Sequence, residues 1–268
     1  MNWLHAKDKF EESKNWIITN QSSDGYISWD EKGKCDPWDH CECLIALSIY
    51  EEWDAFWLGV KWFFDNINDE GLIYAEFQKG KPSKEYFESH HAPYIMLPLM
   101  QAALIDKKQD YHKILNQIQL NKLNKIFKGL KNFQDKDGFY YWAKNDDGYS
   151  DNSLITATMS IYLSIMAKEF LAPDLKTNLW DRKFDRDGVD RSRFSMDFYY
   201  PYLAGIKNNK SEFLKSLEDF YVKGLGVKCV KEEPWVTVAE SCECVIAALA
   251  HENIQIAEDI FNDIQQFQ

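Results

Sequence analysis

Hydrophobic positions along the chain recur with a period near 3.6 residues, and the alternation typical of β-strands is almost absent. Some segments are apolar nearly all round, others are amphipathic and charged, and the two kinds alternate. The pattern predicts an all-α protein with apolar helices inside and amphipathic helices outside. The predicted inner helices cover about residues 38–50, 90–105, 151–168, 196–206 and 235–250, and the outer ones about 8–19, 54–66, 111–132, 210–223 and 253–267.

Alternating inner and outer helices describe two concentric rings, so the predicted architecture is an α/α toroid close to six helix pairs. Five inner helices are visible, and the chain ends at Gln268 in the register of a further repeat. We therefore expect the ring to lack its last inner helix and to be open on one side or closed by a second subunit in an oligomer. Because no Gly/Pro/Ser-rich linker divides the chain, residues 1–268 are predicted to form one domain.

A Gln-xxx-Gly element recurs after predicted outer helices, as Gln21-Ser-Ser-Asp-Gly25 and Gln134-Asp-Lys-Asp-Gly138. A degenerate copy ends at Gly71 without the glutamine. Such repetition is typical of stacked helix pairs. The glutamine is expected to hydrogen-bond free carbonyls at a helix end, and the glycine to take the left-handed backbone geometry of the exit. The element predicts a structural role.

Acidic and aromatic residues precede each apolar helix, and in a toroid all these starts lie at one mouth of the central cavity. We therefore expect an acidic cavity, although acids in a first turn also cap a helix and favour its dipole, as Asp36 before Pro37 would. The candidate catalytic residues are Asp36, Asp39, Glu88, Asp197 and Glu240. The candidate substrate-binding residues are Trp38, His40, His91, Asp151, Asn152, Tyr199, Tyr200 and Trp235.

Neither a metal ion nor another cofactor is expected, because no Cys-xx-Cys or His-Glu-xx-His spacing occurs. His90 and His91 are adjacent, so on a helix at most one of them would face the cavity. The net charge of −12 argues against nucleic acid as a partner. No signal-peptide pattern and no membrane-length apolar stretch is present, so a cytoplasmic location with reduced cysteines is expected.

Four segments carry a resemblance to small bacterial prenyltransferase-like proteins of the terpenoid cyclase and protein prenyltransferase superfamily. They are Asp36-Pro-Trp-Asp-His40-Cys-Glu42, Met196-Asp-Phe-Tyr-Tyr-Pro201, Gly224-Leu-Gly-Val-Lys-Cys-Val230 and Pro234-Trp-Val-Thr-Val-Ala-Glu240. The resemblance implies an α/α toroid and a small isoprenoid or prenyl-linked substrate.

Three functions follow as hypotheses. The first is an enzyme of this superfamily that uses Asp36 or Asp39 as proton donor on an isoprenoid. The second is a carbohydrate-active enzyme of the glycosidase or epimerase kind on a similar toroid, with Glu240 opposite Asp39 or Glu88. The third is a non-catalytic toroid that binds a ligand or a protein. A long apolar cavity would favour the first, a wide polar cleft the second, and a filled centre the third.

Overall fold

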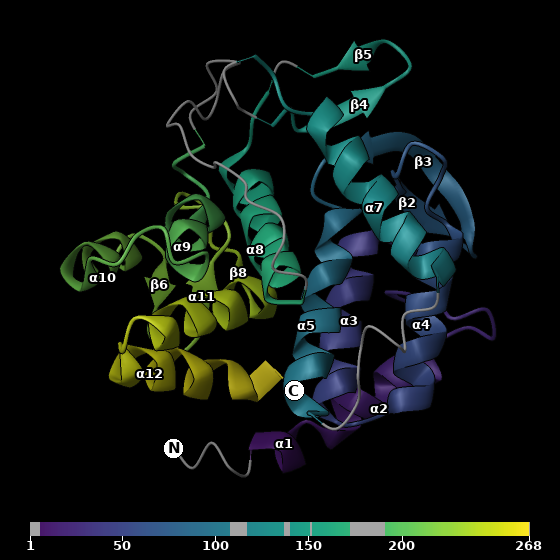
Figure 1. Cartoon of the computed structure of the whole chain (residues 1–268). Helices are drawn as coiled ribbons and strands as arrows, with labels where there is room; N and C mark the ends of the chain where they lie inside the picture. The colour runs from purple at the N-terminus through teal and green to yellow at the C-terminus, as the bar shows by residue number, and fades with distance from the viewer. Residues whose placement is uncertain (1–5, 108–116, 137–139, 151, 172–190, 268) are drawn as a thin grey trace. The chain divides into compact units, whose positions relative to one another are not determined.

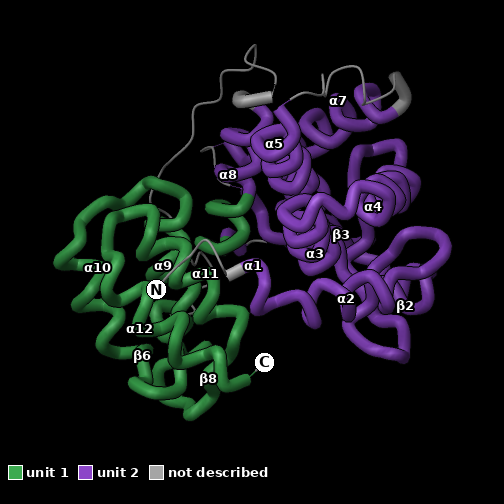
Figure 2. Tube along the Cα trace, turned by 90° about the horizontal axis from the view of Figure 1, so that it is seen from below, with its two compact units in different colours: residues 1, 154–160, 184–268 green, residues 2–153, 161–183 purple. Residues whose placement is uncertain are grey.

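The chain forms two compact units in the computed structural model, which describes residues 6–107, 117–136, 140–150, 152–171 and 191–267 (Figure 2). One unit, here the N-terminal unit, comprises residues 2–153 and 161–183. The other, the C-terminal unit, comprises residues 154–160 and 184–268 together with residue 1. The expectation that residues 1–268 form one domain stays a prediction.

The helices of the N-terminal unit confirm the hydrophobic pattern closely. Helix α3 carries an apolar face of fully buried leucines, Leu44 and Leu47, and it contacts both α4 and α5. Helix α7 buries Leu123 and Ile126 and exposes Lys125 on the opposite face, as an outer amphipathic helix should. The helices are α1 (Ala6–Lys9), α2 (Glu11–Thr19), α3 (Pro37–Ile49), α4 (Trp53–Asp65), the 3₁₀ turn η2 (Pro93–Ile95), α5 (Met96–Ile105) and α7 (Gln117–Asn132) (Figure 1).

The C-terminal unit is built around α11, which contacts α9 and α12. The small side chains of Ala247 and Ala248 are fully buried, which allows close helix packing on that face. The expected helices all form here. They are α9 (Ser195–Leu203), α10 (Lys210–Leu217), α11 (Val238–Ala250), α12 (Ile254–Ile264) and the 3₁₀ turn η3 (Gln265–Phe267); the remaining helix, α8 (Ile155–Leu171), has residues in both units.

The all-α prediction is corrected by two antiparallel sheets. In the N-terminal unit five strands pair in the order of the chain: β1 (Lys34–Cys35), β2 (Tyr74–Gln78), β3 (Lys81–Glu88), β4 (Ala143–Asn145) and β5 (Gly148–Tyr149). In the C-terminal unit β6 (Tyr221–Val222), β7 (Gly226–Lys228) and β8 (Val236–Thr237) form a second sheet. Most of these strands are only two or three residues long, which is too short to show an alternation of apolar and polar residues. The long strand β3 is largely exposed and polar, so it shows no such alternation either.

Two predicted inner-helix starts belong to the five-stranded sheet. Glu88 is the last residue of β3, and the helix that follows begins at Met96 after the 3₁₀ turn. The segment from Asp147 to Asn152 includes β5 in place of a helix start, and Asp151 lies outside the described residues. The acids at these two places are therefore positioned by strand ends, which changes the directions in which their side chains point.

The Gln-xxx-Gly element performs the structural role expected of it. The Gln21 side-chain amide donates to the carbonyl oxygens of Ala55, at 2.8 Å, and Gly25, at 3.2 Å. Gly25 has φ +105°, and a Cβ at this position would lie 2.3 Å from the Leu58 carbonyl oxygen. Any larger residue would clash with α4, so only glycine fits. In the second copy Gln134 pairs with Tyr140, whereas Gly138 lies outside the described residues.

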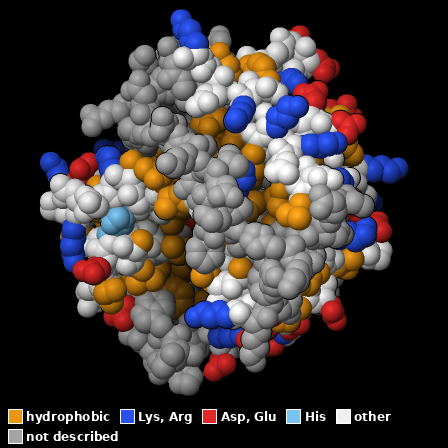
Figure 3. Space-filling model, viewed as in Figure 1, with side chains coloured by type: hydrophobic (Ala, Val, Ile, Leu, Met, Phe, Trp, Pro, Cys, Tyr) orange, Lys and Arg blue, Asp and Glu red, His pale blue; other side chains and the backbone are white. Residues whose placement is uncertain are grey.

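The predicted gap in the helix ring stays a prediction, because it concerns how the two units are placed. Within the described residues, no helix is both long enough and apolar enough to cross a membrane. On the face shown in Figure 3, lysine and arginine side chains are interspersed with acidic ones among the coloured residues.

Candidate functional site

The N-terminus of α3 carries a pair of carboxyl groups, Asp36 and Asp39. Asp36 caps the helix, since its Oδ1 accepts the Asp39 backbone N–H at 2.8 Å, and Pro37 follows as the first helical residue. The predicted capping is thus confirmed. The two carboxyl groups are close enough to influence each other's ionisation.

The Asp36 carboxyl retains its proton to a higher pH than an ordinary aspartate does. Burial, together with repulsion from Asp39, raises the pKa of the Asp36 carboxyl to about 7. Partial burial also raises the pKa of Asp39, whereas its interaction with Asp36 and the charge of the Lys34 ammonium lower it. Asp39 is exposed, so solvent and solutes reach the pair. A protonated carboxyl beside an ionised one is the arrangement that a general acid needs.

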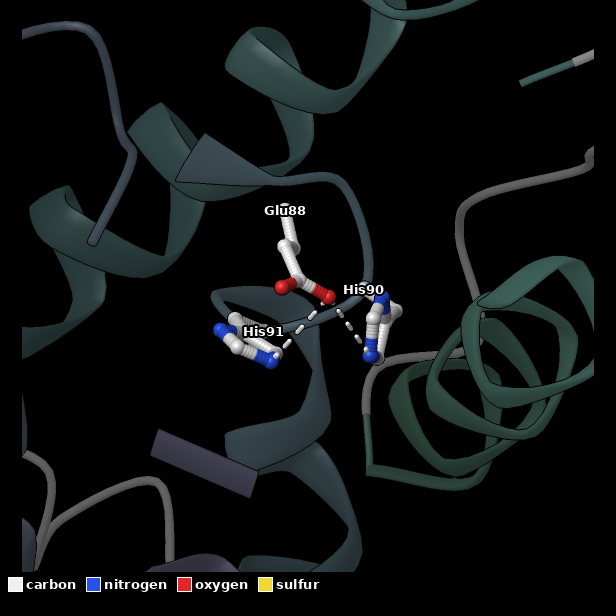
Figure 4. Close-up of side chains that lie close together, drawn as sticks. All are labelled: Glu88, His90 and His91. Atoms are coloured by element: carbon white, nitrogen blue, oxygen red, sulfur yellow. Dashed lines mark ion pairs between the residues drawn. The ribbon is translucent and has the colours of Figure 1, made fainter. Parts of the chain in front are cut away.

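A second cluster forms where β3 ends, with Glu88, His90 and His91 as its members (Figure 4). The Nε2 atoms of His90 and His91 lie 3.7 and 3.6 Å from Glu88 Oε2. The expectation that at most one histidine faces the site is wrong, because residues 89–92 form turns and not a helix. In such a turn adjacent side chains can point to the same place.

Two aromatic residues hold the Glu88 carboxylate. The Tyr86 hydroxyl donates to Oε1 at 2.8 Å, and the Trp142 indole N–H donates to Oε2 at 3.1 Å. Both rings also line a groove of about 620 Å³ over β4 and β5. Its other side chains include Lys144, Asn145, Asp147 and Tyr149. We call this feature the aromatic groove; flat rings with a few polar groups suit a sugar, which has apolar faces and polar edges.

Trp38 links the carboxyl pair to the histidines. It lies on α3 two residues after Asp36, and its ring is edge-on to His90 with centroids 4.7 Å apart. It also lies 5.3 Å from the ring of Tyr94, whose hydroxyl donates to Glu42 at 2.6 Å. Burial raises the pKa of Glu42, although solvent reaches part of this side chain. Trp38 is therefore a half-buried packing residue in this region, and its role in substrate binding stays a prediction.

Sequence analysis missed Tyr86, Trp142, His90 and Glu42 as members of this region. Glu42 had a usable signal, because it follows Asp39 by three residues and so shares its face of α3. Tyr86 and Glu88 are two apart, as side chains on one face of a strand must be. Trp142 is brought in by pairing of β3 with β4, a contact across more than fifty residues that local patterns do not encode.

Three predicted binding residues are corrected. His40 is buried in the core, where Nδ1 accepts the Ile27 N–H at 3.3 Å and Nε2 bonds the Gly59 carbonyl at 3.1 Å. Burial lowers its pKa to about 4, so it is neutral and structural. Tyr199 and Tyr200 are fully buried, and both donate to Glu243. Their hydroxyls and rings are used in packing and are not available to a ligand.

The catalytic and binding roles expected of the remaining candidate residues stay predictions. Asp197 lies in the first turn of α9, and Glu240 lies in the first turn of α11, which Thr237 caps. Trp235 is 60% exposed. The backbone carbonyl oxygen of Asn152 accepts the backbone N–H of Trp142. Because Asp197, Glu240 and Trp235 belong to the C-terminal unit, their convergence with Asp36, Asp39 and Glu88 stays a prediction.

Comparison with known proteins favours carbohydrate chemistry. No protein-family model matches the chain. It is 26% identical over 260 residues to an MMP endo-(1,4)-3-O-methyl-alpha-D-mannosidase of Mycolicibacterium hassiacum, a match that covers 91% of this chain and 71% of the relative.

Solved structures with a similar fold are also carbohydrate enzymes. A glycosidase superposes with a TM-score of 0.68 at 12% identity over 99% of this chain and 85% of its own. A D-mannose isomerase gives 0.68 at 10% identity, covering 96% and 84%. The endo-beta-1,4-glucanase of Acetobacter xylinum gives 0.57 at 12% identity, covering 96% and 100%. The chain thus has a helix-rich fold that resembles the folds of these carbohydrate enzymes. A toroid is consistent with this similarity.

The resemblance to terpenoid cyclases and prenyltransferases is therefore wrong. The detected relative is an endo-mannosidase, and the similar structures include glycosidases and a sugar isomerase. The Gln-xxx-Gly repeat gives no support to a cyclase or prenyltransferase reaction, because its Gln21 to Gly25 copy closes a turn against α4 and thus has a packing role.

Proposed function

We propose that the protein is a carbohydrate-active enzyme that hydrolyses glycosidic bonds, with Asp36 as its proton donor. The observation that carries the proposal is the pair of carboxyl groups at the N-terminus of α3, where Asp36 accepts the Asp39 backbone N–H at 2.8 Å and Asp39 is exposed to solvent. Burial, followed by the charge of Asp39, raises the pKa of Asp36 to about 7, which suits a proton donor near neutral pH. The mannosidase relative and the similarity to glycosidases support the same reading.

In the proposed reaction Asp36 donates its proton to the glycosidic oxygen as the bond to the anomeric carbon breaks. Water then supplies the hydroxyl group at that carbon and gives up a proton to a carboxylate. The Asp36 carboxyl accepts the Asp39 backbone N–H at 2.8 Å, so the two carboxyl groups are too close to act from opposite faces of a sugar, where about 5–9.5 Å is needed. They act as one acid, and the opposing carboxylate is a different residue.

We further propose an α-linked mannoside as the substrate class, with O-methyl groups tolerated. The relative acts on a 3-O-methyl mannoside, and a methylated sugar has more apolar surface for the rings of Tyr86, Trp142 and Tyr149 to contact. The test is incubation with α-(1,4)-mannan oligosaccharides with and without 3-O-methyl groups, β-(1,4)-glucan oligosaccharides, and free D-mannose. Release of new reducing ends supports a hydrolase, whereas formation of a ketose from mannose supports an isomerase. If no sugar turns over, the proposal fails.

The pH profile of the reaction is expected to follow Asp36. Its carboxyl must be protonated to act, and its pKa is raised to about 7, so kcat/KM should fall as the pH rises through about 7. Initial rates between pH 5 and 9 at several substrate concentrations measure this. Thermal unfolding at each pH shows whether the protein remains folded. A profile that stays flat to pH 9 would exclude Asp36 as the acid.

Trp142 is expected to determine substrate affinity through the aromatic groove. Trp142→Ala should raise KM roughly fivefold, because loss of a ring contact costs on the order of 1 kcal/mol. Trp142→Phe keeps a ring but loses the hydrogen bond to Glu88, so its KM should lie between those of wild type and Trp142→Ala. Trp16→Ala is the control, since Trp16 is exposed on α2. An unchanged KM in Trp142→Ala would mean that sugars do not bind in this groove.

A further inference from the structure

We propose that Glu88, His90 and His91 bind a divalent transition-metal ion, and Zn²⁺ is the ion that these donors fit best. The proposal does not rest on the sugar chemistry proposed above. It also revises the expectation, drawn from residue spacing, that the protein has no metal site. Among the described residues, these three each offer a ligand atom, and the three atoms all lie within 4.8 Å of one another.

The distances suit a metal ion at the centre of the cluster. Glu88 Oε2 lies 3.7 Å from His90 Nε2 and 3.6 Å from His91 Nε2. Around zinc, with bonds of about 2.0–2.2 Å, tetrahedral donor atoms are separated by roughly 3.4 Å. Small side-chain rotations would therefore bring all three atoms into bonding distance. The two contacts are too long for hydrogen bonds, which end near 3.2 Å for N–H···O.

The histidine rings otherwise lack partners that their burial demands. His90 and His91 are 3% and 5% exposed. Both ring nitrogens of His90 and the Nδ1 atom of His91 are buried without a hydrogen-bond partner. Each such atom costs about 1–3 kcal/mol when left unsatisfied. A metal ion bound at Nε2 supplies the missing partner of this atom in His90, at the point where the two rings and the carboxylate meet, whereas the two Nδ1 atoms are not partnered by the ion (Figure 4).

The side chains of the cluster are of the types that bind transition metals. A neutral imidazole offers a nitrogen lone pair to a metal ion, and histidine is the commonest metal ligand among protein side chains. Two neutral imidazoles with one carboxylate form a donor set common in zinc and other transition-metal sites.

Neighbouring residues fix the orientation of the ligands. Tyr86 and Trp142 donate hydrogen bonds to the two oxygens of Glu88, and Trp38 packs edge-on against His90. Such outer contacts typically change metal affinity by about 10–100-fold when removed. Three protein ligands also leave a coordination position open to water or another oxygen donor.

Titration of the metal-free protein with Co²⁺ tests the proposal directly. We expect one equivalent to bind, with visible absorption bands of a low-symmetry site and displacement by Zn²⁺. Glu88→Gln and His91→Gln should each weaken Co²⁺ binding by at least tenfold. Matched controls are Glu76→Gln, which alters a carboxylate on the adjacent strand β2, and His251→Gln, which alters a histidine of the C-terminal unit. Far-ultraviolet circular dichroism shows that each variant is folded.

X-ray absorption spectroscopy of the wild-type protein loaded with Zn²⁺ provides a readout that needs no variant. Two imidazole ligands and only nitrogen or oxygen donors are expected. Sulfur ligands would assign the metal to cysteines and overturn the proposal. So would a Kd for Co²⁺ and Zn²⁺ weaker than about 1 mM, or variants at Glu88 and His91 that bind as tightly as the wild type.

Discussion

Replacing Asp36 with asparagine is expected to lower kcat for glycoside hydrolysis by about two to four orders of magnitude, the usual contribution of a general acid. The variant should remain nearly as stable as the wild type, because asparagine caps a helix as well as aspartate does. Asp36→Ala removes the cap as well, and should therefore also lose about 1 kcal/mol of the free energy of unfolding. Kinetics and thermal unfolding of the two variants separate chemistry from capping.

Two further variants sharpen the assignment. Asp30→Asn is a control, since Asp30 only accepts the Lys32 backbone N–H in an exposed turn, and it should leave kcat unchanged. Asp39→Asn removes a charge that helps to raise the pKa of Asp36. The fall in kcat/KM with pH should then move to lower pH. If Asp36→Asn retains full kcat, Asp36 is a helix cap and nothing more.

Replacing Glu243 with alanine is expected to destabilise the C-terminal unit by about 2–6 kcal/mol. The hydroxyls of Tyr199 and Tyr200 both donate to this carboxylate, and both tyrosines are fully buried. Burial, followed by the charge of Glu243, raises the pKa of Tyr199 well above its ordinary value, so that hydroxyl stays protonated and can donate. The alanine variant removes the carboxylate acceptor of both buried hydroxyls, at about 1–3 kcal/mol each. Chemical denaturation monitored by circular dichroism measures the loss.

A variant that removes all three polar groups tests the cause. Tyr199→Phe, Tyr200→Phe and Glu243→Leu together should be more stable than Glu243→Ala alone, because no buried donor is left without a partner. Glu243→Gln keeps an acceptor oxygen and should lie between Glu243→Ala and wild type. A loss below about 0.5 kcal/mol in Glu243→Ala would show that solvent or other groups satisfy the tyrosines.

Two helices share a Cys-Glu-Cys sequence, Cys41-Glu42-Cys43 on α3 and Cys242-Glu243-Cys244 on α11, and this likeness predicts duplication of a helical unit. Glu42 on α3 accepts the hydroxyl of Tyr94, and Glu243 on α11 accepts that of Tyr200, each at 2.6 Å. In both units, then, the glutamate of this segment joins its helix to a neighbouring element. The similarity of the two segments predicts that α3 and α11 are equivalent helices. It does not predict their tyrosine partners, which lie in other elements, Tyr94 in η2 and Tyr200 in α9.

The amino-acid sequence by itself determined where the helices lie and how several of them begin. Period 3.6 and the Asp36-Pro37 cap are local properties, and α3 forms where they predict it. The convergence of Glu88 with two adjacent histidines was decided by the tertiary structure, because β3 ends in turns and not in a helix. Pairing with β4 then brings Trp142 to the same carboxylate. Strand pairing joins residues far apart in the chain, so no local pattern of residues specifies it.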